Sequence, residues 1–238
     1  MRQHGKWLTK LREKILSAEM YSMQFYKYLI EHAIKSSKSR IIILDAGCGE
    51  NPSVEKYDNA LTIGTDINWI LKKSKSLDYL IICSLEALPF KSGVFDLIVN
   101  RWVIEHLENP KVAFGEFFRV LKNEGKLIVS TTNLMNYAML ISWFTPLWFH
   151  TWCRKKLLGT PLENFPTFYR ANTVSKLNRM LLNAGFKKRV LVLAGGAFDY
   201  LRFSTILYIL ALLANRISNW GLLKYFKLHI IACFEKPK

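Results

Sequence analysis

Residues 43–52 read ILDAGCGENP, and this stretch decides the fold. An apolar run leads up to Asp45, and Gly47 and Gly49 follow it directly. Glycine allows a backbone to turn sharply and to approach a ligand where a Cβ would clash. The pattern therefore predicts a buried strand over 41–47 that ends in a ligand-binding turn.

Apolar runs alternate with helical patterns on both sides of this stretch. Each run is continuously apolar, as expected for strands of a parallel sheet covered on both faces. The predicted strands are 41–47, 61–67, 78–84, 95–100, 126–133, 190–194 and 229–236. One or two helices are predicted over 6–35, and further helices after Pro52 and over 68–76, 110–122 and 173–186, with Thr173 as a cap. We expect an α/β fold with a doubly wound, mostly parallel, seven-stranded sheet.

Two segments interrupt this alternation. Residues 134–172 and 197–227 are rich in aromatic and aliphatic residues and read as apolar helical insertions. Residues 1–40 form a basic, amphipathic, helical segment. A chain of 238 residues suits one large domain, so we expect residues 41–238 to form a single domain that carries both insertions.

The composition excludes several classes of protein. Half of the residues are hydrophobic and 22% are charged, which rules out a disordered chain. The four cysteines, Cys48, Cys83, Cys153 and Cys233, form no CxxC pair, so no metal site is expected. They read as reduced thiols of a cytoplasmic protein. No secretory signal and no run of 18 apolar residues is present, so no membrane span is expected.

The net charge of +16 is unevenly distributed. It is +6 over residues 1–40, −2 over 41–135 and +12 over 136–238. Basic flanks indicate an anionic partner, either nucleic acid or an acidic membrane. Because the cations lie beside Trp and Leu-rich stretches, a lipid interface is favoured over nucleic acid. The alternative is a basic surface that simply faces solvent.

A second acid follows the next predicted strand. Asp66 lies 19 residues after Gly47, where a carboxylate can accept hydrogen bonds from both hydroxyls of a ribose. Glu50 would repel a pyrophosphate, and the third glycine that a dinucleotide-binding loop needs is missing. The loop therefore favours S-adenosylmethionine over NAD, and an NAD-dependent dehydrogenase is disfavoured.

With these residues the chain resembles the class I S-adenosylmethionine-dependent methyltransferases, in the group that includes the ubiquinone/menaquinone-type enzymes. The stretches that carry the resemblance are LDAGCGENP (44–52), GTDIN (64–68), LEALPFKSGVFDLIVNRWVIEHLENP (85–110), FFRVLKNEGKLIVSTTN (117–133) and YRANTVSKLNRMLLNAGF (169–186). The resemblance implies an enzyme with a Rossmann-like sheet whose last strand is antiparallel.

The resemblance also implies a cofactor site. Asp45, Gly47, Cys48 and Gly49 would form the loop around the methionine part, and Asp66 would hold the ribose. The remaining contacts would come from Ile67 on the adenine, Ser84 and Leu85 beside its amino edge, and Asn100 under the methionine end. The chain departs from the family at Asn51, usually glycine, and at Ser84, usually an acid.

His106 is the candidate catalytic residue. Methyl transfer to oxygen or carbon requires proton removal, which suits a histidine near the substrate. The alternative is a histidine that caps a helix or contacts a lid. His150, Trp152 and Tyr169 are further candidates for the acceptor pocket.

The apolar insertions and basic flanks together predict the acceptor. We expect O- or C-methylation of a hydrophobic, lipid-like or lipid-linked molecule, by a cytoplasmic protein peripheral to the inner face of the membrane. Nucleic acid is an improbable acceptor, because Asn100 is followed by Arg101 and Trp102 and not by a Pro-Pro-Tyr motif. The alternatives are a soluble small-molecule or sugar acceptor, insertions that form a dimer interface, and a non-catalytic methyltransferase-like binding subunit.

Overall fold

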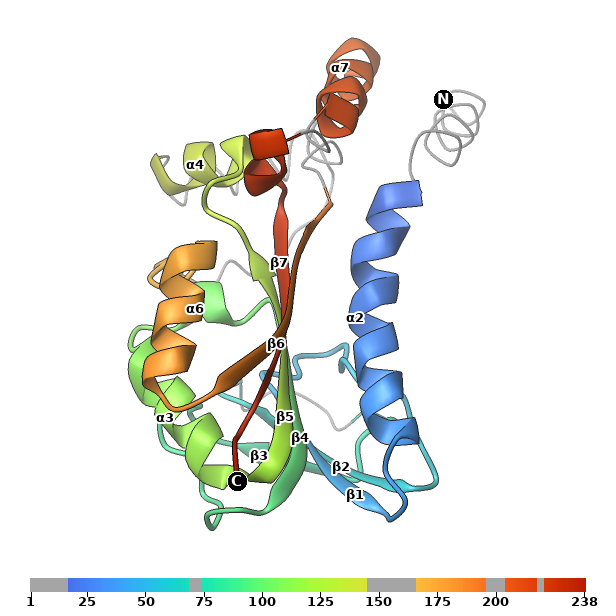
Figure 1. Ribbon diagram of the computed structural model, residues 1–238, viewed down its shortest axis with the longest axis vertical. Helices are drawn as coiled ribbons and strands as arrows, with labels where there is room; N and C mark the ends of the chain where they lie inside the picture. The colour runs from blue at the N-terminus through green and yellow to red at the C-terminus, as the bar shows by residue number, and fades with distance from the viewer. Residues whose placement is uncertain (1–16, 69–73, 145–165, 196–203, 218–220) are drawn as a thin grey trace. The chain divides into compact units, whose positions relative to one another are not determined.

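A computed structural model describes residues 17–68, 74–144, 166–195, 204–217 and 221–238 (Figure 1). The chain forms two compact units. The larger unit comprises Tyr26–Thr132, Thr167–Val192 and Ile230–Lys238. The smaller unit comprises Met1–Phe25, Asn133–Pro166 and Leu193–His229.

One seven-stranded sheet runs in the order β3-β2-β1-β4-β5-β7-β6. Its strands are β1 (Ile41–Ala46), β2 (Ala60–Asp66), β3 (Tyr79–Ile82), β4 (Phe95–Arg101), β5 (Leu121–Thr132), β6 (Lys187–Ala194) and β7 (His229–Glu235). Strands β1 to β5 pair in parallel. Near the start of β5 the Glu124 N–H donates to the Lys236 carbonyl at 2.8 Å, and just after its end the Asn133 N–H donates to the Leu228 carbonyl at 2.6 Å, so β7 runs antiparallel to β5. The predicted mixed seven-stranded sheet is confirmed.

Strand β1 lies centrally between β2 and β4. Its register with β2 runs from Ile41 opposite Ala60 to Ala46 opposite Thr65. Because the pairings are parallel, the carboxyl ends of β1, β2 and β4 meet at one edge of the sheet. The glycine turn that follows β1 is thereby brought beside the ends of two neighbouring strands.

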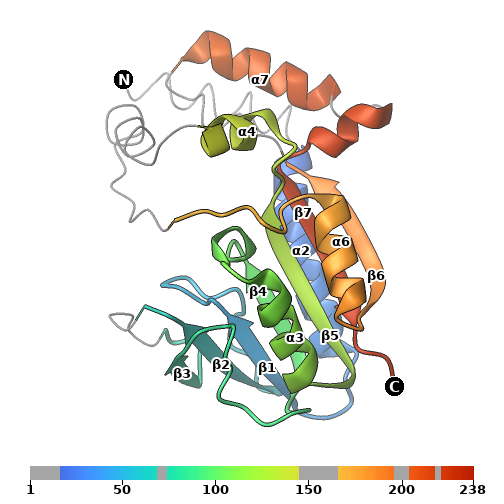
Figure 2. The same ribbon diagram turned by 90° about the vertical axis from the view of Figure 1, so that its left-hand side faces the viewer.

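Helices cover both faces of the sheet in the larger unit. Helices α3 (Pro110–Val120) and α6 (Val174–Asn183) lie on one face, and the part of α2 (Ser17–Lys35) that belongs to this unit lies on the other (Figures 1 and 2). Helix α3 buries Ala113, Phe114, Phe117 and Val120. Buried residues that recur every three or four positions share one face of a helix, which here packs on the sheet.

The prediction of a helix that begins at Pro52 is wrong. Residues 51–59 form bends and a turn that lead directly into β2. Side chains bind the backbone here: Asp45 Oδ2 accepts the Ser53 N–H at 2.6 Å, and the Arg101 guanidinium donates to the Asn51 carbonyl at 2.7 Å. These bonds satisfy backbone groups that a helix would otherwise have paired.

The other predicted helices agree with the structure to different extents. Helices α3 and α6 confirm the segments predicted at 110–122 and 173–186. Helix α2 confirms the later part of 6–35, whose first part lies outside the described residues. Of the predicted helix 68–76, residues 69–73 lie outside the described chain and residues 74–76 lead into a turn.

The smaller unit contains the described parts of the two insertions except residues 167–172, which belong to the larger unit. They form α4 (Tyr137–Phe144), α7 (Thr205–Ile217) and a 3-10 helix, η4 (Gly221–Phe226). Asparagine side chains join them. The Asn133 amide donates to the carbonyls of Tyr225 and Lys227, and the Asn136 amide donates to the Phe226 carbonyl, each at 2.8 Å. The segment after β5 and the segment before β7 therefore form one structure.

We predict that Thr173→Ala destabilises the protein by about 1 kcal/mol, the usual value of an N-cap. The Thr173 hydroxyl accepts the Lys176 N–H at 3.3 Å and is the side-chain cap of α6. Urea unfolding measures the change, with Ser175→Ala in the same helix turn as the control. Equal stability of the two variants would contradict the capping role.

Candidate functional site

The turn after β1 requires glycine at position 47. Gly47 has φ +75°, and a Cβ there would lie 2.4 Å from Val103 Cγ2. The N–H groups of Gly47 and Cys48 both donate to the Thr65 carbonyl, at 2.7 and 3.0 Å. These bonds fix the turn against the end of β2.

Gly49 brings the turn into contact with the predicted ribose-binding acid. Its N–H donates to Asp66 Oδ2 at 3.0 Å, while Asp66 Oδ1 accepts the Asn68 N–H at 3.0 Å. Gly49 has φ +53°, and a Cβ built on it would meet no atom within 4 Å. The backbone of the turn therefore borders open space beside the carboxylate.

Asn51 does not adopt the left-handed backbone of a third glycine. Positive φ among the described non-glycine residues occurs at Trp102, Glu124 and Tyr169. The Asn51 carbonyl is instead held by Arg101. The loop thus closes without a glycine at this position.

Buried polar atoms gather at the carboxyl edge of the sheet. Among the described residues, Asp45 Oδ1, Thr65 Oγ1 and Asn100 Oδ1 are buried without a hydrogen-bond partner. They end β1, β2 and β4, and Asn100 is oriented by its amide, which donates to the Ala46 carbonyl at 2.7 Å. Since buried polar atoms are normally paired, three unpaired oxygens at one edge indicate a site for a polar ligand.

Burial raises the pKa of Asp45 to about 6, an effect that the Ser53 N–H and the charge of Arg101 partly offset. Tyr26 of α2 is also fully buried, and its hydroxyl has no partner among the described residues. Burial, followed by the Asp45 carboxylate, raises the pKa of Tyr26. An acid and a hydroxyl are thus enclosed together behind the loop.

The residues predicted to surround the adenine follow β2 and β3. Ile67 is 63% exposed although it is large and apolar. Leu85 is buried, and the exposed Ser84 uses its hydroxyl to accept the Glu86 N–H at 3.1 Å. The Cys83 N–H donates to the Asp66 carbonyl at 2.9 Å, which holds this segment beside β2.

Cys48 packs as a small buried residue. A Cβ built on Gly64 would lie 2.9 Å from its sulfur, so the thiol packs directly on β2. Burial, then the charges of Asp45 and Asp66, raises the pKa of Cys48 to about 12. The thiol stays protonated, and a nucleophilic role is disfavoured.

Glu105 anchors the segment that precedes α6. It lies in a 3-10 turn, η1 (Ile104–His106), and is buried, which raises its pKa. Its carboxyl accepts the Thr131 hydroxyl at 2.8 Å, and the Asn172 amide donates to the same hydroxyl at 2.7 Å. This network could not be predicted from the sequence, because its members lie far apart along the chain.

His106 completes the η1 turn and is half-buried. Its backbone N–H donates to the Val103 carbonyl at 2.9 Å. Tyr169 is buried with φ +50°, and its N–H donates to the Glu105 carbonyl at 3.2 Å. His150 and Trp152, the other predicted acceptor-pocket residues, lie outside the described residues.

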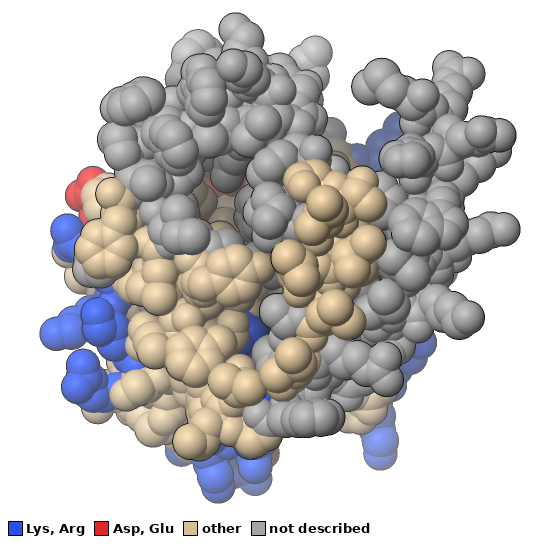
Figure 3. Space-filling model, turned by 90° about the horizontal axis from the view of Figure 1, so that it is seen from above, with Lys and Arg blue, Asp and Glu red and all other residues tan. Residues whose placement is uncertain are grey.

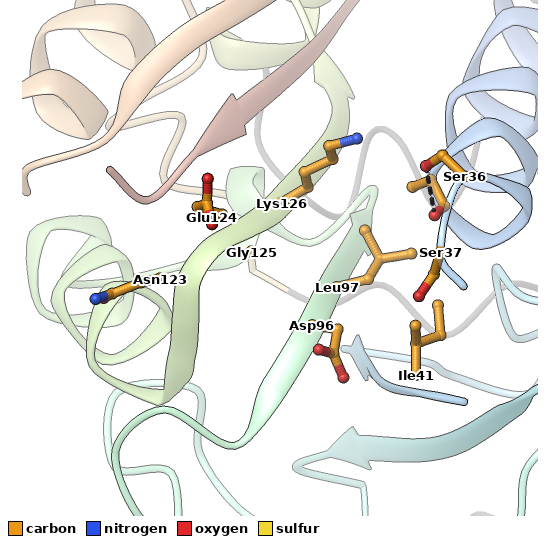
Figure 4. Close-up of a pocket in the computed structure, with 10 residues that line it drawn as sticks. Ser36, Ser37, Ile41, Asp96, Leu97, Asn123, Glu124, Gly125 and Lys126 are labelled. Carbon is orange, nitrogen blue, oxygen red and sulfur yellow. Dashed lines mark hydrogen bonds between the residues drawn. The ribbon is translucent and has the colours of Figure 1, made fainter. Parts of the chain in front are cut away.

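A separate cavity of about 230 Å³ lies at the opposite edge of the sheet, where β1 and β4 begin (Figure 4). It is bordered by Ser36 and Ser37 after α2 and by Asp96 of β4. The Asp96 carboxylate already accepts the Ile42 N–H and Lys122 Nζ, each at 2.8 Å. Ligands of doubly wound sheets bind at the carboxyl ends of the strands, so this cavity is on the wrong edge for a cofactor.

Residues 44–129 match the methyltransferase domain family. The ubiquinone/menaquinone biosynthesis C-methyltransferase of Xylella fastidiosa strain M23 is 32% identical over 121 residues, which are 47% of this chain and 46% of the relative. An uncharacterized protein of Methanocaldococcus jannaschii is 38% identical over 98 residues, which are 41% of this chain and 43% of the relative. The matched stretch, residues 44–129, is therefore similar to the domain of class I S-adenosylmethionine-dependent methyltransferases.

Solved structures agree with this methyltransferase fold. Geranyl diphosphate C-methyltransferase from Streptomyces coelicolor A3(2) superposes with a TM-score of 0.55 at 12% identity, covering 90% of this chain and 78% of that protein. The chain spans less than half the length of the curated relatives described above. Three described cysteines, Cys48, Cys83 and Cys233, are free thiols, and the described residues contain no cluster suited to a metal ion.

We predict that the two glycines of the methyltransferase loop differ in their effect on stability. Gly47→Ala should cost about 3 kcal/mol, because the backbone strain adds to a clash with Val103. Gly49→Ala should cost about 1 kcal/mol, because only the backbone strain applies. Thermal and urea unfolding of both variants measure the loss of stability. A larger loss for Gly49→Ala than for Gly47→Ala would contradict the prediction.

We predict that Asp45→Asn stabilises the protein increasingly as the pH rises from about 4 to about 7. The raised pKa means that the folded state binds a proton which the unfolded state has released, so ionisation of Asp45 costs stability across this window. The gain at pH 7 should approach about 3 kcal/mol. Urea unfolding at pH 4.5 and pH 7 measures it, and a difference that does not change with pH would refute the assignment.

Proposed function

We propose that this protein transfers a methyl group from S-adenosylmethionine to a hydrophobic acceptor. The observation that supports it most is the bond between the Gly49 N–H and the Asp66 carboxylate, which joins the glycine turn to the acid. The family match over residues 44–129 gives independent support.

The residues at this edge suit the proposed cofactor. Asp66 would accept from the ribose hydroxyls, and Ile67 offers an exposed apolar side chain to the adenine. The unpaired oxygens of Asp45 and Asn100 are acceptors that suit an ammonium group. Acidic groups at Asp45, Glu50 and Asp66 would repel a pyrophosphate, which counts against NAD.

S-adenosylmethionine supplies a methyl group on a positively charged sulfur, which an in-line nucleophile can attack. The protein would contribute positioning and the exclusion of water. We assign His106 as the base that takes a proton from an oxygen or carbon acceptor. Glu105, held by Thr131 and Asn172, would act as a positioning residue that fixes the η1 turn.

We further propose that the acceptor is lipid-like or lipid-linked, methylated on oxygen or carbon at a membrane surface. A relative named as a ubiquinone/menaquinone biosynthesis C-methyltransferase, and another named as a malonyl-[acyl-carrier protein] O-methyltransferase, support an acceptor with an apolar part. The insertions also expose large apolar side chains, including Phe144 at 76% and Ile206 at 72%.

Incubation with methyl-labelled S-adenosylmethionine tests this acceptor class. The purified chain is mixed in parallel with a membrane lipid extract and with a soluble metabolite extract. Label that enters the organic phase supports a lipid-like acceptor. Label confined to the aqueous phase would leave the methyltransferase assignment intact but refute the lipid, and cofactor binding without any transfer would support a binding subunit.

We predict that Asp66→Asn weakens binding of S-adenosylmethionine by roughly 10- to 100-fold, because hydrogen bonds to a charged acceptor are lost. Calorimetric titration measures the affinity. Asp58→Asn is the matched control, since Asp58 is exposed in the turn before β2. Unchanged affinity in a folded Asp66→Asn variant would refute the ribose role, and a response to NAD but not to S-adenosylmethionine would overturn the cofactor.

A further inference from the structure

Helix α7 of the smaller unit carries a stripe of exposed apolar side chains. Ile206, Leu210, Leu213 and Ile217 are 72%, 55%, 48% and 51% exposed. Because an α-helix advances about 100° per residue, these four positions fall within an arc of about 60°. They therefore form a continuous line along one side of the helix.

The opposite side of α7 is already buried. Tyr208, Ala211 and Leu212 are 1%, 7% and 0% exposed, and they point roughly 180° away from the exposed stripe. The helix thus has one apolar face that is buried and a second apolar face that is exposed. A helix that is apolar all round is normally covered on every side. We therefore expect the exposed face of α7 to bind another apolar surface.

The next described segment along the chain, η4, also exposes apolar side chains. Leu222, Leu223, Tyr225 and Phe226 are between 44% and 79% exposed. Their backbone is nevertheless held in place, because the amides of Asn133 and Asn136 bind the carbonyls of Tyr225, Phe226 and Lys227. We call these eight exposed side chains of α7 and η4 the α7–η4 surface. On the face drawn in Figure 3 most of the described side chains are tan, with blue Lys and Arg side chains at the left and lower margins.

The sequence of this region is basic, since residues 200–234 contain no Asp or Glu. Among its described lysines, Lys224 is exposed and Lys227 is buried. Lys224 lies within η4 itself, is exposed, and has its ammonium 5.6 Å from the Tyr225 ring centre. Cations beside aromatic and aliphatic side chains, with acids absent, suit the headgroups of anionic lipids.

We infer that the α7–η4 surface inserts into the interfacial layer of an anionic membrane. At about 1.5 Å per residue α7 is about 20 Å long, shorter than the roughly 30 Å hydrocarbon core, so it would lie in the surface plane. In the part of the chain that the structure describes, no helix is long and apolar enough to cross a membrane. This inference deepens the proposed action at a membrane surface, on which it rests, by assigning the segment that binds the lipid.

Flotation of the full chain with vesicles tests the inference. The chain should float with vesicles of phosphatidylcholine and phosphatidylglycerol at 7:3 and 50 mM salt, a composition chosen to be anionic. The double variant Leu210→Ser/Leu213→Ser should bind about 100-fold more weakly, at about tenfold for each leucine. Its matched control is Val112→Ser/Leu182→Ser, since these residues are 50% and 45% exposed on α3 and α6 of the larger unit.

Charge provides a second readout. Lys224→Gln should weaken binding about fivefold, and vesicles of pure phosphatidylcholine or 500 mM salt should weaken it further. Lys188→Gln, an exposed lysine of β6, is the control.

Three results would overturn the inference. The first is a folded chain that fails to float with anionic vesicles. The second is a Leu210→Ser/Leu213→Ser variant that floats as well as its control. The third is a chain that forms a dimer by light scattering and does not bind vesicles, when the Leu210→Ser/Leu213→Ser variant is a monomer. That result would assign the surface to contact with a second copy of the chain. Calorimetry with S-adenosylmethionine on the same variant separates this outcome from a failure of the cofactor site.

Discussion

The hydrogen bond from the Gly49 N–H to the Asp66 carboxylate is the constraint on which the site depends. It joins the turn after β1 to the end of β2, and the two N–H groups that bind the Thr65 carbonyl reinforce it. With the turn held in this way, the backbone at Gly49 can border open space without collapsing into it. The parallel register of β1 and β2 supplies the rest, because it aligns the ends of the two strands.

The same edge concentrates acceptor atoms that the protein leaves unpaired. Asp45, Thr65 and Asn100 each present a buried oxygen without a partner among the described residues. Such atoms cost stability, and a polar ligand that donated to them would recover this cost. At the proposed site, the features that would favour ligand binding therefore lower the stability of the protein.

Much of this fold could be predicted from the sequence, because continuous apolar runs mark strands that are covered on both faces. The spacing from Gly47 to Asp66 also predicted a carboxylate beside the loop, since parallel neighbours end at one edge. The Pro52 helix failed because long-range bonds decide that segment: the Arg101 side chain binds the Asn51 carbonyl from β4. Likewise, no local pattern reveals that Glu105 meets Thr131 and Asn172, which approach it only in the folded chain.

The way η4 is attached has a consequence for how this protein can diverge. The side-chain amides of Asn133 and Asn136 donate hydrogen bonds to main-chain carbonyls, a group that every amino acid possesses. Evolution can therefore exchange the side chains of residues 222–226 freely without loosening their anchorage, whereas replacing either asparagine by aspartate would remove the donor. Paralogues can thus acquire new preferences at this segment while keeping one inherited framework.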